Sequence, residues 1–459
     1  MSTGWKKKDK NNERGHIAIR YRAYPTDEQS QKAAQIDGCC RQIKNLAKEQ
    51  RDLAYRLTGK SPGYTAQTKD LKELRDDPEL APWLSSVPSQ ILQQALRDRD
   101  AGYQRFFSGK AKYPTWAKKS SRIGFRVPQH VEIERISRRW GEVRIQGMGW
   151  IRIRMHRPPV GSHISSATYT REPDGKAFIS ILCERHKRQP TKPLDKENTT
   201  IGIDRGVAVA IATSDGDLIN RENWTPKERE RLVRLERTRE RKKRARARTQ
   251  VKGEVSHKSK RQVKTELAIT ALHARVRRRR NDFVEQVSYD LAKNHATVVF
   301  EDLHLAAMTR SAKGTIDSPG KNIRQKSGLN RVILDKALGK ILTRTDDKAH
   351  NHGHLVLCVP APGTSITCPE CGYRDADNRA SRSVFICKLC GHRAHADVNA
   401  AINIRERGIK LALAGRTPVA AYQGTNLEPA SVGAEPGAVS DGRGSGNEKT
   451  GYITERVPA

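Results

Sequence analysis

Apolar residues in the first part of the chain follow helical spacing. After a short alternating stretch at residues 17–21, one helical pattern begins at Thr26 and a second begins at Ser89. The two expected apolar faces consist of Ile36, Cys40, Ile43, Ala47, Ala54 and Leu57, and of Leu92, Leu96, Tyr103 and Phe107. The spacing therefore predicts one strand followed by two amphipathic helices.

Residues 122–184 alternate between apolar and polar with period two. Ile151 and Ile153 flank Arg152, and Pro173-Asp174-Gly175 marks a turn between two alternating runs. This pattern predicts a small β domain, for which a barrel is one form, with helices inserted before most of its strands. A polar linker follows at residues 187–198.

The second half of the chain mixes buried strands with charged helices. Apolar runs at 201–213, 297–303 and 354–359 predict strands, and helical spacing predicts helices at 226–248, through the face Ala268–Leu291, and at 397–407. This alternation is typical of an α/β domain. Beyond Gly415 the chain is rich in Gly, Ala, Ser and Pro and leans acidic, which predicts disorder.

The net charge of the chain indicates which kind of partner the protein binds. The 459 residues include 87 Lys and Arg against 51 Asp and Glu, a net charge of +36. Such an excess favours nucleic acid as the partner, although ribosomal and membrane-surface proteins are also basic. No apolar run approaches the roughly 20 residues of a membrane helix, and residues 1–14 lack the apolar core of a secretory signal. A cytoplasmic, nucleoid-associated protein with no membrane partner is expected.

The cysteines indicate a metal site. Two C-x-x-C pairs, each followed by a glycine, are separated by fifteen residues, whereas Cys39, Cys40, Cys183 and Cys358 show no disulfide pattern. This spacing matches a tetrahedral four-thiolate zinc site, and four thiolates leave no open position for catalysis. One structural Zn²⁺ is therefore expected at Cys368, Cys371, Cys387 and Cys390. Zinc ribbons occur in proteins of many functions, so this site says little about activity.

Three separated carboxylates form the second candidate site. Asp204 ends the first predicted strand of the α/β domain, Glu301 ends a buried strand, and Asp397 begins the last helix. Individually these residues could be a turn residue, a solvated strand end and a helix N-cap. Together they fit a ribonuclease H-like sheet, in which two Mg²⁺ or Mn²⁺ ions about 4 Å apart would act on a phosphodiester. Asp302 should point to the opposite face and is the weaker candidate ligand.

The order of these motifs resembles one family. Gly202-Ile-Asp204-Arg-Gly206, Phe300-Glu301-Asp-Leu303, Thr364-Ser-Ile-Thr-Cys368-Pro-x-Cys371-Gly372, Cys387-x-x-Cys390-Gly391 and Ala396-Asp397-Val-Asn-Ala-Ala-Ile-Asn403 occur in the order found in the transposon-encoded TnpB proteins and their relatives, the compact type V CRISPR effectors. Weaker similarities lie at residues 19–25, 109–114 and 125–128. The chain departs from many members at Ile366, where they carry Gln, and at Ala396, where they carry Arg.

The resemblance implies a domain plan and an activity. It implies a β-barrel wedge domain (15–24 and 120–190) with a helical recognition insert (25–119), and a RuvC-like nuclease domain (199–367 and 393–410) holding basic helices (226–292) and a zinc ribbon (368–392). A flexible basic lead (1–14) and a disordered tail (411–459) complete it. The family also implies a guide RNA, a double-stranded DNA target, and catalytic roles for Asp204, Glu301 and Asp397.

The basic helices are the third candidate site. Between Lys227 and Arg280 there are 22 Lys or Arg and six Glu, an excess too large for mutual pairing, although a solvated face or an ion-paired coiled coil is the alternative. We expect contacts to the nucleic-acid backbone that read no bases. The candidates are Arg241, Lys242, Lys243, Arg244, Arg246, Arg248, Arg275, Arg277, Arg278, Arg279 and Arg280.

Two smaller patterns concern aromatic and histidine residues. Tyr24, Tyr64, Trp83, Tyr113 and Trp116 could stack on bases, but core positions are the commoner role of such residues. His350, His352 and His354 alternate before a strand, where a solvated edge is the commoner role, and they are left out of the site.

Three functions are compatible with these features. The first is an RNA-guided DNA endonuclease of a transposable element. The second is a transposase or recombinase that acts on DNA ends without a guide, and the third is a zinc-ribbon protein that binds nucleic acid without cutting it. Three intact carboxylates favour a nuclease over the third.

Overall fold

The computed structural model describes residues 14–77, 79–120, 122–159, 163–186, 199–249, 257–315 and 318–413. The chain divides into two compact units, Met1–Pro418 and Val419–Ala459, and every described residue belongs to the first. The predicted basic lead up to residue 13, the linker 187–198 and the tail beyond residue 413 lie outside the described residues. None of the helices in the described ranges is long and apolar enough to cross a bilayer.

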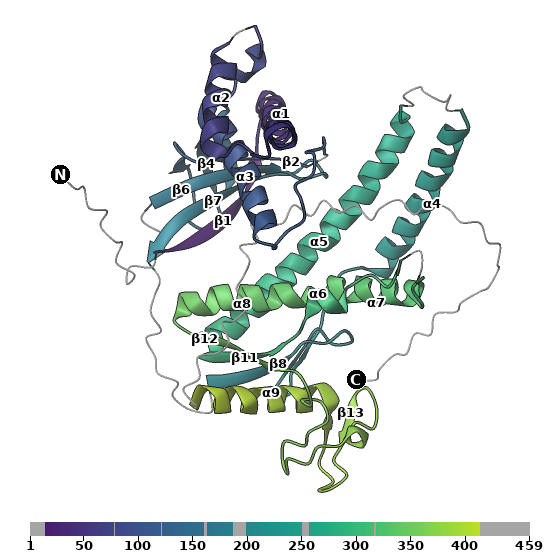
Figure 1. Ribbon diagram of the computed structural model, residues 1–459. Helices are drawn as coiled ribbons and strands as arrows, with labels where there is room; N and C mark the ends of the chain where they lie inside the picture. Colours follow the sequence, from purple (N-terminus) through teal and green to yellow (C-terminus); the bar gives the residue numbers. More distant parts are fainter. Residues whose placement is uncertain are drawn as a thin grey trace. The chain divides into compact units, whose positions relative to one another are not determined.

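The N-terminal sheet has seven antiparallel strands in the order β2-β6-β7-β1-β5-β4-β3 (Figure 1). Its strands are β1 (Arg14–Tyr24), β2 (Ile123–Val127), β3 (Glu132–Arg135), β4 (Trp140–Ile145), β5 (Gly149–Arg154), β6 (His163–Arg171) and β7 (Ala177–His186). The predicted alternation is confirmed in β5, where Ile151 and Ile153 are buried while Arg152 and Arg154 are exposed. The pairing leaves β2 and β3 at the two edges among the described strands, so a closed barrel stays a prediction.

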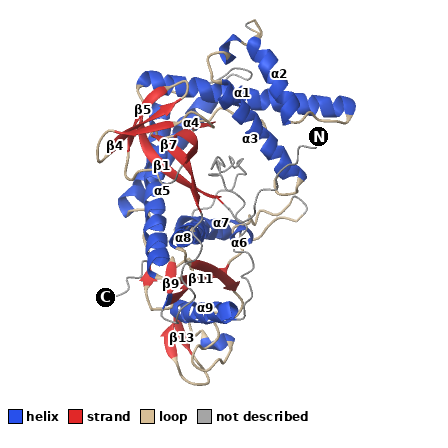
Figure 2. Cartoon of the chain, turned by 90° about the vertical axis from the view of Figure 1, so that its left-hand side faces the viewer, coloured by secondary structure: helices blue, strands red, loops and turns tan. Residues whose placement is uncertain are grey.

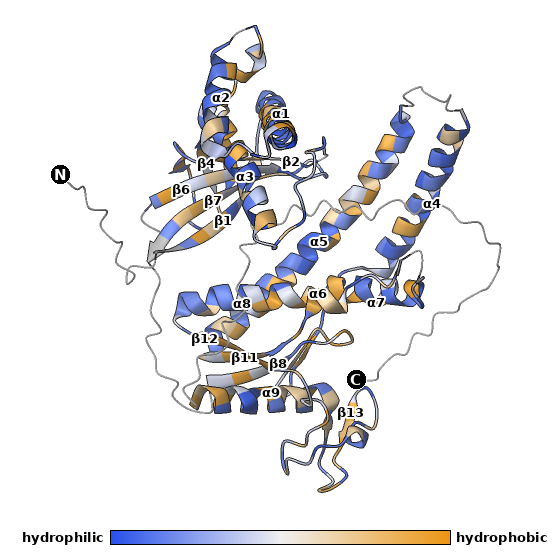
Figure 3. Ribbon diagram, in the orientation of Figure 1, coloured by the Kyte–Doolittle hydropathy of each residue, from blue (hydrophilic) through white to orange (hydrophobic). Residues whose placement is uncertain are grey.

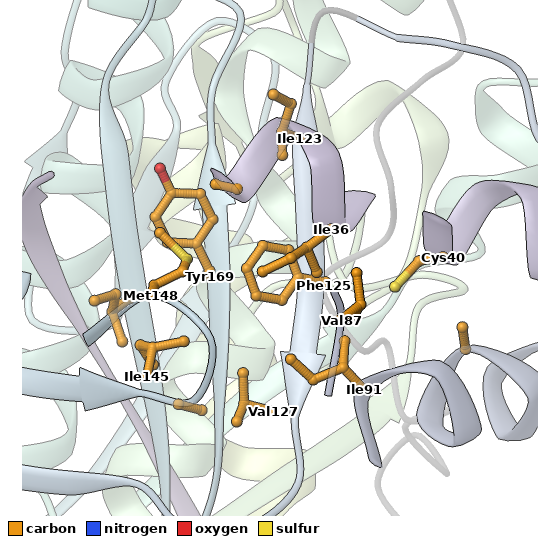
Figure 4. Close-up of a cluster of buried hydrophobic side chains, with 14 of the residues drawn as sticks. Ile36, Cys40, Val87, Ile91, Ile123, Phe125, Val127, Ile145, Met148 and Tyr169 are labelled. Carbon is orange, nitrogen blue, oxygen red and sulfur yellow. The ribbon is translucent and has the colours of Figure 1, made fainter. Parts of the chain in front are cut away.

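Three α-helices lie between β1 and β2 in the sequence. They are α1 (Asp27–Thr58), α2 (Tyr64–Asp76) and α3 (Ser89–Phe107), with a short 3₁₀ turn, η1 (Pro82–Leu84), before α3. Thr26 begins α1 with a capping box to Gln29, and Gly59 ends it in the left-handed region at φ 70°. Ile36 and Cys40 of α1 pack with Ile91 of α3 against Phe125 and Tyr169 of the sheet (Figure 4).

The predicted apolar faces of these helices are confirmed for the residues close to the sheet, but the prediction is wrong at the far ends of the helices. Ile36, Cys40, Ile43 and Ala47 are buried, but Leu57 is 74% exposed and Phe107 is 71% exposed. Periodicity tells which face of a helix is apolar, but it does not tell where the surface that covers this face ends. Helix α2, with only Gln67 and Leu71 buried, was not predicted because its apolar stripe is too narrow.

The second sheet is mixed, with the strand order β10-β9-β8-β11-β12. Its strands are β8 (Thr200–Asp204), β9 (Ile211–Thr213), β10 (Leu218–Ile219), β11 (Thr297–Asp302) and β12 (Leu355–Pro360). Strands β8, β11 and β12 are parallel, while β9 and β10 are antiparallel to their neighbours. The α/β architecture predicted for this half of the chain is therefore present.

Helices cover both faces of the second sheet. The helices of this half of the chain are α4 (Pro226–Thr249), α5 (Lys260–Asn294), α6 (Leu305–Met308), α7 (Ile323–Lys336), α8 (Leu338–His352) and α9 (Ala396–Leu413). Helices α8 and α9 lie on opposite faces (Figures 1 and 2). His350 and His352 belong to the last turn of α8, so these histidines do not alternate along a strand as the sequence suggested.

Helix α9 approaches the second sheet very closely. A Cβ atom added at Gly202 of β8 would lie 2.0 Å from the carbonyl oxygen of Ala401, and one added at Gly408 of α9 would lie 2.4 Å from a methyl carbon of Val299. Glycine at both positions lets helix and strand backbones meet without side chains between them. This close packing brings the start of α9 to the end of β8.

Candidate active site and metal centre

The three candidate carboxylates come from three elements of the second sheet and its covering helix. Asp204 is the last residue of β8, Glu301 stands near the end of β11, and Asp397 lies in the first turn of α9. Because β8 and β11 are parallel neighbours with Ile203 opposite Phe300, their carboxyl ends lie at the same edge of the sheet. Glu301 is 9% exposed and Asp302 faces solvent, as the strand alternation predicted.

The environment of Asp204 opposes its negative charge. Burial raises the pKa of Asp204 to about 7, and the carboxylates of Glu301 and Asp397 contribute to this rise, while the Arg379 guanidinium counteracts them in part. The three carboxylates are therefore close enough to interact electrostatically. Without a nearby cation, the negative charge of Asp204 is therefore disfavoured at neutral pH.

Glu301 is oriented by a hydroxyl that the sequence did not single out. Thr364, which is 3% exposed, donates a hydrogen bond from Oγ1 to Glu301 Oε1 at 2.7 Å. The backbone of the same loop is held by α9, because Asn403 Nδ2 donates to the carbonyl oxygens of Thr364 at 2.9 Å and Thr367 at 2.7 Å. A buried polar side chain with these partners restricts Glu301 to one orientation.

Arg205 links the ends of the two strands that carry Asp204 and Glu301. It is 5% exposed, and its Nη2 donates to the carbonyl oxygen of Glu301 at 2.5 Å while its Nη1 donates to that of Leu338 at 3.1 Å. The guanidinium also lies over the Phe300 ring, 5.2 Å from its centroid. These contacts join β8, β11 and the start of α8 directly behind the carboxylates.

Asp397 has a cationic neighbour. Arg379, next to the 3₁₀ turn η3 (Ala376–Asn378), approaches Asp397 with 3.5 Å between Nη2 and Oδ1. Both side chains are partly exposed, at 33% and 18%, so this pair is weak by itself. It places one positive charge from the cysteine-rich segment beside the carboxylate edge.

The four candidate zinc ligands come together at one point. The Cys368 and Cys390 sulfurs are 3.7 Å apart and the Cys371 and Cys387 sulfurs 3.5 Å apart. A regular tetrahedron with metal–sulfur bonds of about 2.3 Å has sulfur–sulfur distances of about 3.8 Å, so the four thiols fit one zinc-sized ion. The short strands β13 (Val384–Ile386) and β14 (Arg393–His395) pair beside them.

The carboxylates form a wider group than the cysteines. Among the described residues, the four cysteines are the one set of three or more His, Cys, Asp or Glu whose ligand atoms all lie within 4.8 Å. At least one pair of carboxylates among Asp204, Glu301 and Asp397 therefore has its oxygens farther apart than 4.8 Å. A site for two ions about 4 Å apart does not need them to be, because each carboxylate can serve a different ion.

The basic run of α5 has partners within the protein. Arg277 pairs with Glu172 at 2.5 Å, Arg278 with Asp174 at 2.7 Å, and Arg280 with Asp335 at 2.5 Å. Arg279 holds Glu228 through two hydrogen bonds of 2.6 and 2.7 Å, and Arg275 approaches the same carboxylate at 3.4 Å. The sequence did not foresee these ion pairs, because the carboxylate partners are distant from the five arginines in sequence; phosphate contact by these arginines stays a prediction.

The Glu228 pair is the best formed of these. Hydrogen bonds from Arg279 are the main cause that lowers the pKa of Glu228 to about 2. Arg279 also donates to the carbonyl oxygen of Asn223 at 2.8 Å, so one side chain joins α5 to the loop before α4. This arrangement indicates that the α5 arginines position elements of the C-terminal half of the chain and the β6–β7 turn.

The basic end of α4 differs from α5. Lys243, Arg244 and Arg248 are exposed and Arg246 is half-buried. Within the described part of the chain, no carboxylate forms an ion pair with these four residues or with Arg241, whereas Lys242 is bound to α5 through Thr265 Oγ1 at 2.8 Å. The hydropathy colouring shows α4 as almost uniformly hydrophilic (Figure 3). Among the residues that the structure describes, this end of α4 is therefore a positive surface without carboxylate partners.

Three family descriptions match the chain. "Cas12f1-like, TNB domain" matches residues 339–404, "Probable transposase" matches 180–312, and "Helix-turn-helix domain" matches 15–60. The first match contains Thr364, the four cysteines and Asp397, and the second contains Asp204 and Glu301. In this structure, residues 15–60 form β1 and the single long helix α1.

Individual proteins are similar over most of the chain. "Putative RNA-guided DNA endonuclease InsQ" of Escherichia coli (strain K12) is 33% identical over 391 residues, which cover 85% of this chain and 92% of that protein. "Putative RNA-guided DNA endonuclease" of Streptomyces pristinaespiralis is 29% identical over 405 residues, covering 87% and 90%. The solved Cas12f1–sgRNA–target DNA complex has a TM-score of 0.41 with 14% identity, covering 86% of this chain and 99% of that one.

Proposed function

Since this chain belongs to the TnpB family of transposon-encoded proteins, the OrfB group of probable transposases, we propose that it is an RNA-guided DNA endonuclease. Its proposed active site, where the DNA is cut, consists of Asp204, Glu301 and Asp397. The observation that carries the assignment of the site is the meeting of these carboxylates at one sheet edge, where the pKa of Asp204 rises to about 7. A buried carboxylate whose ionisation is opposed by neighbouring carboxylates is typical of a site built for divalent cations.

The mixed sheet supports a RuvC-like nuclease domain. Three parallel strands with an antiparallel pair at one edge, in the order β10-β9-β8-β11-β12, agree with the ribonuclease H-like sheet expected from the sequence. Oxygen ligands suit Mg²⁺ or Mn²⁺, which would supply Lewis acidity to the attacking water and to the leaving oxygen of the phosphodiester. Asp204, Glu301 and Asp397 would hold these ions.

The surrounding residues keep this site in order. Thr364 fixes the carboxylate of Glu301, and Arg205 keeps the ends of β8 and β11 in register. Arg379 lies where a positive charge can hold Asp397 and attract a phosphate. The four cysteines, holding one structural Zn²⁺, would keep the segment that carries Arg379 in place.

The end of α4 is the proposed grip on nucleic acid. Arg241, Lys243, Arg244, Arg246 and Arg248 present positive charge without carboxylate partners among the described residues, as a sequence-independent backbone contact requires. A guide RNA and a double-stranded DNA target are the proposed partners, because the similar proteins from Escherichia coli and Streptomyces pristinaespiralis carry that activity in their names.

The test is cleavage of a plasmid by purified protein loaded with RNA transcribed from the DNA that flanks its gene. We expect Mg²⁺-dependent cleavage of a matched target, and loss of at least a hundredfold in rate for Asp204→Ala, Glu301→Ala and Asp397→Ala with RNA binding retained. Asp302→Ala is the matched control, since this neighbour of Glu301 faces solvent, and it should cut within a few-fold of the natural protein.

The outcomes separate the alternatives. Cleavage that needs no RNA would favour a transposase or recombinase that acts without a guide. Full cleavage by the Asp204 or Asp397 variant would refute the assignment of the site. Binding of RNA and DNA without any cleavage in Mg²⁺ or Mn²⁺ would favour a zinc-ribbon protein that binds and does not cut.

A further inference from the structure

An exposed group of aromatic rings lies at the end of the helical insert. Phe106 and Phe107 end α3, and Tyr113 and Trp116 follow in the next segment; we call these four residues the aromatic patch. Phe107 is 71% exposed, Trp116 48% and Tyr113 44%. The apolar end of α3 is visible in the hydropathy colouring (Figure 3). Core positions, the commoner role of such aromatics in a sequence, are therefore not where Tyr113 and Trp116 lie.

Three rings of the patch, those of Phe106, Phe107 and Tyr113, contact one another, while Trp116 lies beside them across the Lys48 ammonium group. Phe106 meets Tyr113 edge to face with 5.1 Å between ring centroids, and Phe107 lies 5.4 Å from Phe106. Beneath them, the buried ring of Tyr103 stacks on Phe107 at 6.3 Å and meets Tyr113 edge to face at 5.7 Å. Exposed aromatics that support one another in this way keep flat faces available to a ligand.

The segment that carries Tyr113 and Trp116 is fastened to the helices beside it. Asn45 of α1 exchanges two hydrogen bonds with the backbone of Ala117, at 2.7 and 3.1 Å, and Arg99 of α3 donates to the carbonyl oxygen of Thr115 at 2.9 Å. The Tyr113 hydroxyl donates to Asp52 of α1. The patch is thus held in place before any ligand arrives, which lowers the entropic cost of binding.

Positive charge surrounds the rings and negative charge is scarce. Residues 101–122 contain six Lys or Arg and no Asp or Glu. Arg105, Lys110, Lys112, Lys118 and Lys119 are all exposed. Lys48 Nζ lies between two rings, 4.6 Å from the Tyr113 centroid and 5.1 Å from that of Trp116, and it is paired with Asp52 at 2.5 Å. The combination suits bases on the rings and phosphates on the surrounding cations.

We propose that the aromatic patch stacks unpaired bases of the guide RNA. A duplex hides its base faces, so an aromatic platform selects single-stranded nucleic acid. The five exposed cations around the patch favour a polyanionic strand, whose phosphates neutralise them, as the ligand. An exposed apolar surface of this kind marks an interaction site or an aggregation liability unless a partner covers it, and a guide RNA is the single-stranded partner that the proposed function supplies. The choice of guide RNA rests on the proposed function.

The test uses the full chain and a 12-nucleotide single-stranded RNA of uridines with one central 2-aminopurine, whose fluorescence falls when it stacks. Phe107→Ala and Trp116→Ala should each remove most of the quenching and weaken binding roughly fivefold to a hundredfold, the range for losing one base–aromatic stack. Tyr55→Ala is the matched control, because Tyr55 of α1 is 64% exposed and makes no ring contact with the patch among the described residues. Trp116→Phe should restore the signal.

Salt titration separates stacking from charge. Phe107→Ala should leave the slope of log affinity against log salt unchanged, while Lys112→Gln with Lys118→Gln should flatten it by about 0.7 for each phosphate that is no longer neutralised. If Phe107→Ala and Trp116→Ala bind and quench like the natural protein, the patch does not stack bases and the proposal fails. This result would leave target cleavage untouched, so it differs from a failure of the proposed function.

A second arm identifies the occupant. In the complex loaded with guide RNA, 2-aminopurine at successive unpaired guide positions should be quenched at one or two neighbouring positions, and Phe107→Ala should abolish this. Quenching that occurs only when the label is placed in the DNA target would overturn the guide RNA as occupant.

Discussion

Asp204 is the carboxylate of the candidate site whose ionisation is opposed by its surroundings. Burial and the neighbouring carboxylates of Glu301 and Asp397 all oppose its ionisation, and the pKa rises from 3.8 to about 7. A group whose pKa is higher in the folded than in the unfolded state binds extra protons when folded between these two pH values. The free energy of unfolding contributed by Asp204 therefore falls as pH rises from about 4 to 7.

This sign gives a prediction for Asp204→Asn without added divalent metal. At pH 8 the variant should be more stable than the natural protein by roughly 1 to 4 kcal/mol, because it removes an opposed charge. Near pH 4 the difference should be far smaller, since Asp204 is then protonated in the folded protein. Urea unfolding at the two pH values measures it, with the exposed Asp302→Asn as control. Equal stability of Asp204→Asn and the natural protein at pH 8 would show that the charge is not opposed.

Thr364 gives a second prediction, because it acts on Glu301 through one hydrogen bond of 2.7 Å. Thr364→Val keeps the shape but removes the hydroxyl, and hydrogen bonds to charged groups contribute about 1.5–3 kcal/mol, so the cleavage rate should fall roughly tenfold to a hundredfold. The Mg²⁺ concentration needed for half-maximal rate should rise as well. Thr364→Ser should restore both. A valine variant with normal rate and metal dependence would remove Thr364 from the site.

Helices α4 and α5 show that similar runs of basic residues can have different roles. Four consecutive arginines of α5 form ion pairs with Glu172, Asp174, Glu228 and Asp335, which lie far from them in sequence. These arginine side chains are between 27% and 43% exposed, so each pair contributes little alone, and the two bonds from Arg279 to Glu228 should contribute most. The end of α4 has no such partners among the described residues, so its charge is available to phosphate.

The difference predicts two separate phenotypes for equal reductions of charge. Lys243→Gln, Arg244→Gln and Arg248→Gln combined should flatten the salt dependence of RNA binding by about 0.7 to 0.9 for each phosphate that is no longer neutralised, with the stability unchanged. Arg277→Gln, Arg279→Gln and Arg280→Gln combined should lower the melting temperature and leave most of the salt slope intact. Salt titrations and thermal unfolding of both triple variants decide this. An unaltered slope in the α4 variant would mean that its cations are only a solvated face.

At the scale of the whole molecule, a surface that attracts anions coexists with two candidate sites for metal cations. A net charge of +36 favours a polyanionic partner, whereas the four thiols could hold one metal ion and the three carboxylates are the proposed ligands of others. The thiols and the carboxylates are also linked through the chain, since Asn399 and Asn403 of α9 donate to the carbonyl of Thr367, beside the first zinc cysteine. Order in the cysteine-rich segment therefore supports Thr364 and Arg379.

We predict one zinc per chain, and loss of that zinc in Cys371→Ser. The variant should lose ordered structure between residues 364 and 395 and should cut at least tenfold more slowly, because Thr364 and Arg379 are no longer held, while both sheets stay folded. Elemental analysis, hydrogen exchange and the cleavage assay measure the three effects. Cys358→Ser is the control, since this cysteine lies outside the cluster and its variant should keep the zinc. Absence of zinc from the natural protein would reject the assignment.

The sequence by itself determined the elements and the ligands whose evidence is local. The period of apolar residues predicted β1, α1, α3, the β6–β7 hairpin and β8, β9, β11 and β12 of the second sheet, because side-chain periodicity follows directly from helix and strand geometry. The C-x-x-C spacing and the carboxylates at strand ends are equally local. The structure brings the four thiols together and places Asp204, Glu301 and Asp397 near one edge.

Tertiary structure alone decided which side chains are left without partners. Arg277 and Glu172 are 105 positions apart, and Thr364 and Glu301 are 63 apart, so no local spacing could pair them. The exposure of Phe107 and Trp116 depends likewise on where the N-terminal sheet ends beneath α1 and α3. Burial and charge compensation are properties of the neighbours that folding brings together, and the sequence order of those neighbours carries no direct record of them.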